Sequence, residues 1–223
     1  MDILIEDIQG SLLVACIANR RIEGLDIDPE SEIIRWGSIY WARVERVDAG
    51  LNLAFIDLGY GFKGVLNAGD VVNKKSEGVA KSKRKIGQLL SAGEMIAVQV
   101  KTARNPIDDD EPERGRNEHK ASKVSMDIAL PGRYMIYAPL MDGNRVSRRI
   151  SDPNLRKNLR QMLVNVKEMS GCILRAAAAS CQTDILIREG KILSAVWDNL
   201  QEYMSGKDPQ LLMLGPDAIQ RSL

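Results

Sequence analysis

Aromatic and cationic side chains recur between residues 37 and 66, in a segment that also has the pattern of short strands. Two apolar runs flank the turn Asp48-Ala-Gly-Leu51, and a third run follows a glycine-rich turn and ends at Leu66. Alternation along these runs predicts that Ile39, Val44 and Val47 face a core. It places four other side chains toward solvent: Tyr40, Arg43, Arg46 and Lys63. A face of rings and cations suits the bases and phosphates of a single strand, so the sequence favours single-stranded RNA as the partner.

Groups that could catalyse a reaction do not gather in a recognisable pattern. His119 is the single histidine and has no serine or cysteine partner in a known motif. The run Asp108-Asp-Asp-Glu-Pro-Glu113 is acidic, but the prolines and charges around it predict a flexible loop without fixed metal geometry. Asp57 and Asp127 are interpreted as turn or strand-edge carboxylates. We therefore expect no catalytic residue, no metal site and no cofactor in this chain.

The elements that must position the aromatic and cationic residues are mostly short strands. Apolar segments at residues 3–5, 12–17 and 22–27 predict three strands within residues 1–34. The strands from residue 35 onward, with a further strand at 95–100, predict a five-stranded barrel of the OB type over residues 35–127, with a mobile loop at 104–120. The basic run 73–85 is either a solvated loop or a phosphate contact.

The second half of the chain mixes strands and helices, so the predicted class is α+β. Strands are expected at 134–139, 146–150, 171–176 and 211–214. Ser151 or Asp152, followed by Pro153, predicts the start of a helix that runs to about residue 167. Thr183 or Asp184 is expected to cap a second helix, although Gly190 leaves open a shorter one. Its buried face is predicted to hold Leu186, Leu193, Trp197, Leu200 and Met204. Gly215-Pro-Asp217 begins a last helix.

Composition limits the remaining possibilities. The chain has 223 residues and a formal net charge of +1, so any RNA contact must come from local patches. Three cysteines without a C-x-x-C pair indicate reduced thiols. Without a leader pattern or an apolar run of about 18 residues, we expect no membrane partner and a cytoplasmic protein.

Four motifs, in order, resemble the ribonuclease E/G family. The segment from Gly37 to Leu66 resembles its S-one-type RNA-binding domain, through G-x-I-Y-x-x-x-V-x-R-V, A-F-I-D-L-G and G-x-L. Three later motifs resemble further segments of that family: Ile128-Ala-Leu-Pro-Gly-Arg-Tyr134, Val146-Ser-Arg-Arg-Ile150 and Gly171-Cys-Ile-Leu-Arg-Ala176. Together they extend over most of the chain.

The resemblance implies RNA-binding residues in the barrel. Phe55 lies where the family stacks a base; the alternative is that Phe55 belongs to the barrel core. Val65 stands where the family has a second aromatic residue, and Tyr60 or Phe62 could replace that ring. Lys120 matches a lysine that touches the RNA backbone, although a solvated lysine fits equally well.

The resemblance also implies a pocket for the 5′-monophosphate of RNA. Arg175 matches the arginine that binds this phosphate, assisted by backbone groups near Gly132 and Ile136. A guanidinium fork suits a terminal phosphate. Ala176 replaces the family's threonine, so one hydroxyl donor is missing. Arg175 could instead be an ordinary surface arginine, and Arg148 and Arg149 add positive charge.

By the same resemblance, residues 1–34 and 208–223 are part of an RNase-H-like subdomain, and residues 128–207 form a 5′-sensor-like subdomain. The family is a Mg²⁺-dependent, single-strand endoribonuclease of rRNA processing or mRNA decay, with possible homo-oligomers at full length. The nuclease domain would follow residue 223, so we expect this chain to bind RNA without cutting it. Two alternatives stay open: a stand-alone RNA-binding module, and an OB-fold interaction scaffold without an RNA role.

Overall fold

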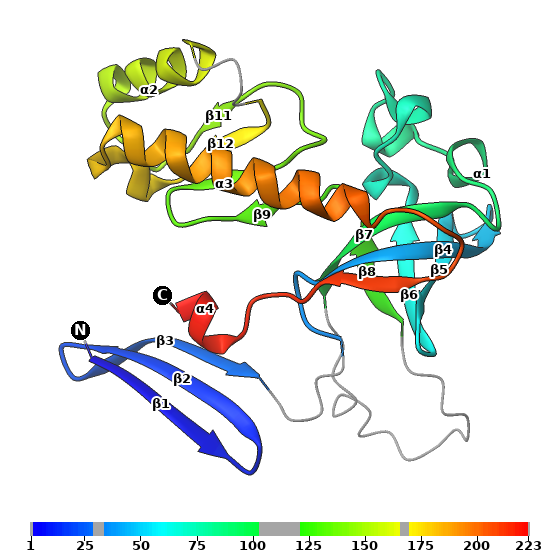
Figure 1. The fold of residues 1–223 in the computed structure, drawn as a ribbon, viewed down its shortest axis with the longest axis horizontal. Coiled ribbons are helices and arrows are strands. Elements are labelled where there is room, and N and C mark those ends of the chain that lie inside the picture. The colour runs from blue at the N-terminus through cyan, green and yellow to red at the C-terminus, as the bar shows by residue number, and fades with distance from the viewer. Residues whose placement is uncertain (1, 29–33, 103–120, 166–169, 223) are drawn as a thin grey trace. The chain divides into compact units, whose positions relative to one another are not determined.

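The computed structural model describes residues 2–28, 34–102, 121–165 and 170–222. The chain divides into two compact units (Figure 1). The first unit comprises Met1–Asp70, Val79–Ser125 and Lys207–Leu223, and the second comprises Val71–Gly78 and Met126–Gly206. The expected α+β class with a closed five-stranded barrel is confirmed.

The barrel of the first unit consists of β4 (Ile39–Asp48), β5 (Leu53–Gly59), β6 (Phe62–Asn67), β7 (Met95–Thr102) and β8 (Ser122–Ser125). The strand order is β4-β5-β6-β8-β7, and pairing of β7 with β4 closes the barrel. Strands β6 and β8 are parallel, and the other barrel pairs are antiparallel. Its interior is apolar: Val44, Ile56, Leu66, Val98 and Val124 are fully buried. The short helix α1 (Ile86–Leu89) packs near β4.

A bulge in β4 decides which of its side chains face outward. Val44 pairs with Ile56 and Arg46 pairs with Phe55, so Glu45 is an extra residue in β4. The bulge reverses the alternation, which brings Arg46 to the outer face together with Arg43. Before the bulge, Tyr40 has the same parity as Val44 and is 3% exposed. The expectation that Tyr40 faces solvent is therefore wrong, and burial raises the pKa of its phenol.

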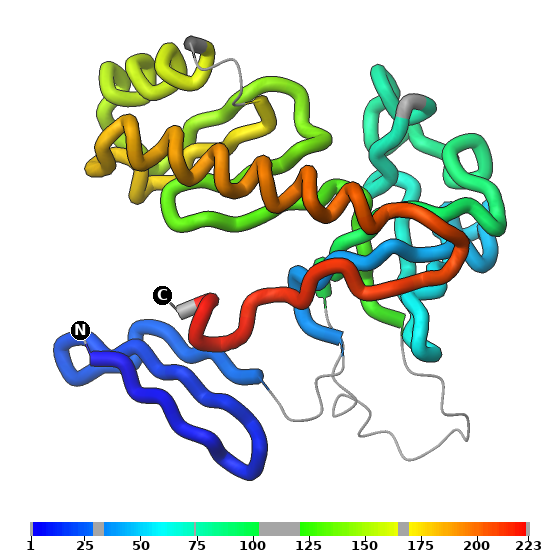
Figure 2. Tube along the Cα trace, viewed as in Figure 1, coloured from blue at the N-terminus to red at the C-terminus, as the bar shows by residue number. Residues whose placement is uncertain are grey.

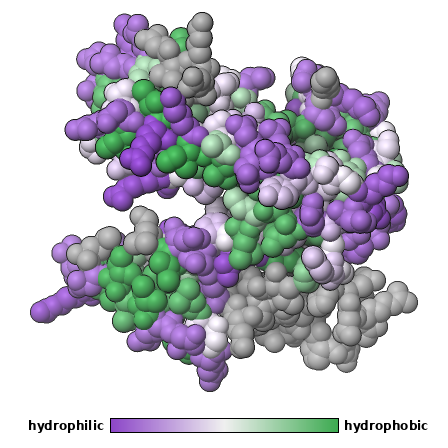
Figure 3. All heavy atoms as spheres, viewed as in Figure 1, coloured by the Kyte–Doolittle hydropathy of each residue, from purple (hydrophilic) through white to green (hydrophobic). Residues whose placement is uncertain are grey.

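The N-terminal strands form a separate antiparallel sheet within the first unit. The three strands that the sequence predicted are β1 (Asp2–Ile8), β2 (Ser11–Ala18) and β3 (Arg21–Asp28), and they lie in that order in the sheet. Helix α4 (Ala218–Ser222) packs on β2 and β3, and β13 (Gln210–Met213), which precedes it, pairs with β4 (Figure 2). Apolar side chains remain exposed on this sheet (Figure 3), among them Ile5, Ile22 and Leu25.

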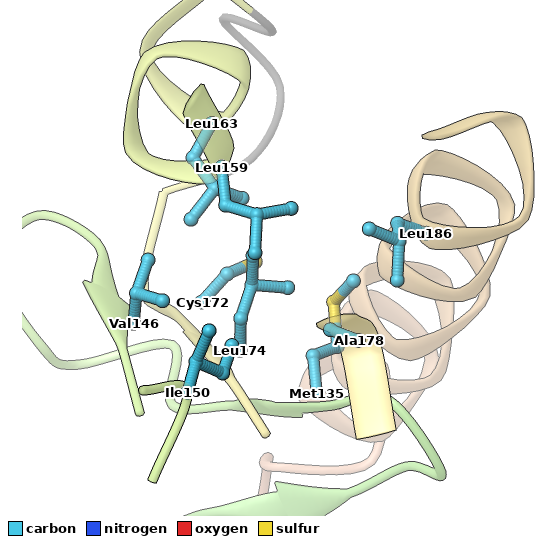
Figure 4. Close-up of a cluster of buried hydrophobic side chains, with 9 residues drawn as sticks. All are labelled: Met135, Val146, Ile150, Leu159, Leu163, Cys172, Leu174, Ala178 and Leu186. Atoms are coloured by element: carbon cyan, nitrogen blue, oxygen red, sulfur yellow. The ribbon is translucent and has the colours of Figure 1, made fainter. Parts of the chain in front are cut away.

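The second unit is a small mixed sheet with two helices. Strands β9 (Leu130–Pro131), β10 (Met135–Tyr137), β11 (Arg145–Val146) and β12 (Cys172–Leu174) lie in the order β11-β12-β10-β9. Helices α2 (Pro153–Asn165) and α3 (Thr183–Glu202) share one core with the sheet (Figure 4). That core includes Met135, Leu159, Leu163, Leu174 and Leu186.

The starts of the two helices differ from each other. Asp152 caps α2, because its Oδ1 accepts hydrogen bonds from the backbone N–H groups of Asn154 and Leu155 at 2.8 and 3.3 Å. For α3 the predicted side-chain cap is wrong: the N-cap residue is Gln182, and its side chain makes no capping bond. Helix α3 nevertheless continues through Gly190, which is buried. Within the part of the chain that the structure describes, no helix is long and apolar enough to cross a membrane.

Candidate nucleic-acid interface

Phe55 lies on the outer face of the barrel and not in its core. Its neighbours on β5 point inward, since Ala54 and Ile56 are fully buried, while Phe55 is half-buried. The core alternative for Phe55 is therefore excluded by the alternation of β5. The guanidinium of Arg46 lies 4.4 Å from the centre of the Phe55 ring, a cation–π contact between neighbouring strands.

Strand pairing extends this contact into a row of four side chains across the barrel. Arg46 on β4 pairs with Phe55 on β5, Phe55 with Val65 on β6, and Val65 with Lys123 on β8. We call these four residues the outer row. It has an apolar centre and a cation at each end, and surfaces that bind single-stranded nucleic acids combine the same two kinds of group. Lys123 was not predicted from the sequence, because its position depends on the parallel pairing of β6 with β8.

Lys63 and Arg43 also face outward, but acidic groups surround them. The Nζ of Lys63 lies 3.0 Å from the Glu45 carboxylate and 3.8 Å from that of Asp57. Arg43 donates a hydrogen bond to the carbonyl of Lys207 and lies 3.8 Å from the Asp208 carboxylate. These ion pairs compete with phosphate, so Lys63 is a weaker candidate than Lys123, whose Nζ lies 3.8 Å from Asp70.

The other rings and cations that the sequence suggested as RNA contacts differ in how exposed they are. Tyr60 is 85% exposed in the turn between β5 and β6, and Phe62 is half-buried at the start of β6. In the basic run, Arg84 donates hydrogen bonds to the carbonyls of Val79 and Gly69, at 3.1 and 3.3 Å, and so supports the local backbone. Lys120, His119 and the acidic run 108–113 lie outside the described residues.

Arg175 forms a second site, in the second unit. It is exposed after β12, its backbone N–H donates to the carbonyl of Tyr134 at 2.7 Å, and its Nη1 donates to the carbonyl of Gly132 at 2.7 Å. Two of the three residues expected at the phosphate pocket, Arg175 and Gly132, are thus in direct contact. Ile136 lies on β10, paired with Ile173 and Pro131.

Glu189 of α3 also belongs to this site, and no sequence pattern predicted it. Its carboxylate accepts hydrogen bonds from three consecutive backbone N–H groups of the turn between β9 and β10: Arg133 at 2.7 Å, Tyr134 at 3.0 Å and Met135 at 3.0 Å. The approach is so close that a Cβ at Gly132 would lie 2.7 Å from Glu189 Oε1. The contact joins residues more than fifty positions apart, so a local pattern could not have revealed it.

Among the described residues, no group of three or more His, Cys, Asp or Glu side chains could hold a metal ion. The outer row combines a ring with cations, and the second site exposes a guanidinium next to a backbone turn.

Known proteins resemble this chain in sequence. The model of the Ribonuclease E/G family matches residues 129–223. Ribonuclease G of Salmonella typhimurium is 27% identical over 98% of this chain, and Ribonuclease E of a Nostoc species is 30% identical over 84% of it. The chain spans 43% of the length of the first of these relatives and 26% of the second. The resemblance to the ribonuclease E/G family is thereby confirmed.

Proposed function

We propose that this relative of the ribonuclease E/G family binds single-stranded RNA on its barrel and recognises the 5′-monophosphate of the RNA at Arg175. The observation that carries the proposal is the outer row, in which Arg46, Phe55, Val65 and Lys123 lie side by side across four strands. Three of its four residues, Arg46, Phe55 and Val65, lie in the segment that resembles the S-one-type domain. The role that follows is in rRNA processing or mRNA decay.

In this proposal a base stacks on the Phe55 ring, and the neighbouring cations bind the phosphates on either side. Arg46 already lies over the ring and can exchange this contact for a phosphate as the base enters. Val65 offers apolar contact where a second ring would stack, so the platform has one ring in this row. Lys63 and Lys120 are secondary backbone contacts.

At the second site, the guanidinium of Arg175 binds the terminal phosphate next to the turn that contains Gly132. A guanidinium has five N–H donors, so the bond to the Gly132 carbonyl leaves others for phosphate oxygens. Ala176 supplies no hydroxyl, which we expect to weaken the pocket by about 1–3 kcal/mol relative to one with a threonine. Backbone groups near Gly132 and Ile136 complete the proposed pocket.

Cleavage is proposed to require polypeptide that is not in this sequence. We place residues 35–127 in the RNA-binding domain and residues 128–207 in the 5′-sensor-like part. Residues 1–34 and 208–223 are assigned to a partial RNase-H-like subdomain. Mg²⁺ would belong to a nuclease domain beyond them. A cytoplasmic setting is part of this proposal.

The test is fluorescence anisotropy with one short single-stranded RNA that carries either a 5′-monophosphate or a 5′-hydroxyl. We expect the phosphorylated RNA to bind about tenfold more tightly, and Arg175→Ala to remove that difference. Arg160→Ala, which replaces an exposed arginine on α2 of the same unit, is the matched control. Equal binding of both RNAs would refute end recognition, and no binding of either would refute the RNA-binding proposal.

A second measurement addresses cleavage. We expect the purified chain to leave single-stranded RNA intact in the presence of Mg²⁺. Cleavage that co-purifies with the chain, and that Phe55→Ala reduces, would show that the catalytic groups lie within these residues after all.

A further inference from the structure

The Glu189 carboxylate is a negatively charged group held by backbone N–H donors, next to the arginine that is proposed to bind phosphate. It comes from α3, while the donors belong to the turn Gly132–Met135 between β9 and β10. A carboxylate that accepts hydrogen bonds from several backbone N–H groups fixes the conformation of the segment that contains those groups. Glu189 therefore sets the shape of this turn.

The same turn also holds Arg175. Gly132, its first residue, accepts the hydrogen bond from Arg175 Nη1 through its carbonyl, and its own N–H donates to the carbonyl of Met135 at 2.8 Å. A continuous series of contacts thus runs from the Glu189 carboxylate, through the turn backbone, to the guanidinium. No side chain other than hydrogen fits at Gly132 without moving Glu189.

We propose that Glu189 is a positioning residue for the 5′-phosphate pocket: its carboxylate fixes the Gly132–Met135 turn, and the turn fixes the guanidinium of Arg175. This inference rests on the proposed function, because it assigns the residue that prepares the same pocket. Fixing a long arginine side chain before binding reduces the entropy that the phosphate contact would otherwise cost. Glu189 does not touch the phosphate itself.

Both carboxylate oxygens are needed for this role. Oε1 accepts a hydrogen bond from the backbone N–H of Arg133, and Oε2 accepts one from the backbone N–H of Met135. The backbone N of Tyr134 lies 3.3 Å from Oε1 and 3.0 Å from Oε2. A glutamine of the same size has one oxygen, and its NH₂ group would face N–H groups of the turn. Glu189→Gln therefore loosens the turn while it preserves the packing of α3.

The experiment measures the ratio of dissociation constants for 5′-hydroxyl and 5′-monophosphate RNA in four proteins: the unchanged chain, Arg175→Ala, Glu189→Gln and Glu202→Gln. Glu202 is exposed at the end of the same helix, so Glu202→Gln makes the same change of charge away from the turn. We expect Glu189→Gln to lower the ratio at least about threefold and to leave the affinity for 5′-hydroxyl RNA unchanged. Glu202→Gln should preserve the ratio.

The outcomes separate this inference from the proposed function. Suppose that the unchanged chain discriminates between the two RNAs and that Arg175→Ala abolishes this discrimination. If Glu189→Gln then keeps the full ratio of dissociation constants, Glu189 is a packing residue and the inference is wrong. A higher ratio in Glu189→Gln would also overturn it, because the carboxylate would then compete with phosphate for the turn. Failure of the unchanged chain to discriminate would overturn the proposed pocket and this inference together.

Loss of folding in Glu189→Gln would be recognised from its circular dichroism spectrum. In that case Glu189→Asp replaces it in the same measurement, because aspartate keeps the charge and is one methylene too short to reach all three N–H groups. A ratio lowered at least about threefold supports the positioning role, and an unchanged ratio contradicts it.

Discussion

Phe55 is the residue through which the barrel is expected to bind RNA most directly. Replacing it with alanine removes the ring on which a base would stack, and we expect a loss of about 1–3 kcal/mol of binding free energy. The fold should persist, because the ring is half-buried on the outer face while Ala54 and Ile56 fill the interior. Anisotropy with a 5′-hydroxyl RNA measures the effect without a contribution from the end pocket.

The matched control for this substitution is Leu51→Ala. Leu51 is an apolar residue in the turn before β5 and is 65% exposed, so its replacement removes apolar surface away from the outer row. Equal loss of affinity in the two variants would contradict a specific stacking role for Phe55.

Cys172 offers a prediction about pH in the second unit. Burial raises the pKa of its thiol from an ordinary 9.0 to about 11. The unfolded chain therefore loses this proton at a lower pH than the folded chain, so the stabilisation from the neutral, buried thiol is complete below about pH 9 and disappears as the pH rises through about 11.

Because the thiolate is the reactive form, Cys172 should also resist alkylation. With iodoacetamide near pH 8, we expect Cys16 and Cys181, which are partly exposed, to be modified well before Cys172. Mass spectrometry of the digested protein measures each rate. Modification of Cys172 as fast as the other two would contradict its burial.

At the scale of elements, α4 depends on a pair of charges that local sequence does not reveal. The carboxylate of Asp28, at the end of β3, accepts a hydrogen bond from the N–H of Ala218 at 2.7 Å and lies 2.8 Å from Arg221 Nη2. Burial alone lowers the pKa of Arg221, but Asp26 and Asp28 outweigh it and raise the pKa. Asp28 thus contacts both ends of the helix, at the N–H of Ala218 and at the guanidinium of Arg221.

We expect Asp28→Asn to lower the free energy of unfolding by about 1–3 kcal/mol, since it leaves a largely buried arginine with one fewer charged partner. Hydrogen exchange should rise first in residues 218–222. Asp26→Asn makes the same change at a side chain that is 34% exposed, and its effect should be smaller. An equal effect of the two substitutions would show that Asp28 has no special role.

Local patterns were enough for the elements whose ends depend on neighbouring residues. The apolar segments at 12–17 and 22–27 predicted β2 and β3, and Asp152 before Pro153 predicted the start of α2. The alternation of β4 was misread at Tyr40, because a bulge at Glu45 changes the parity partway along the strand. Lys123 and Glu189 were not predicted for another reason. Lys123 pairs with a residue of β6, and Glu189 accepts hydrogen bonds from a turn, and both partners are distant in sequence.

For the whole molecule, the small net charge makes the salt dependence of RNA binding informative. With a net charge of +1, affinity must come from a few local cations, chiefly Arg46 and Lys123 of the outer row. Each phosphate neutralised on a single strand contributes about −0.7 to the slope of log K against log salt, so two contacts give about −1.4. Lys123→Ala should reduce the magnitude of this slope by about 0.7. The measurement is a titration of 5′-hydroxyl RNA between about 50 and 200 mM salt.

Arg21→Ala separates local contact from overall charge, because it lowers the net charge by the same amount at an exposed position on the N-terminal sheet. If binding depends on the outer row, this control should leave the slope unchanged while Lys123→Ala reduces it. If Arg21→Ala and Lys123→Ala reduce the slope equally, RNA binding depends on the net charge of the whole molecule. That result would contradict the proposal that the outer row is the binding surface. A slope reduced by Lys123→Ala alone would instead locate one phosphate at the β8 end of the row, next to the base that is proposed to stack on Phe55.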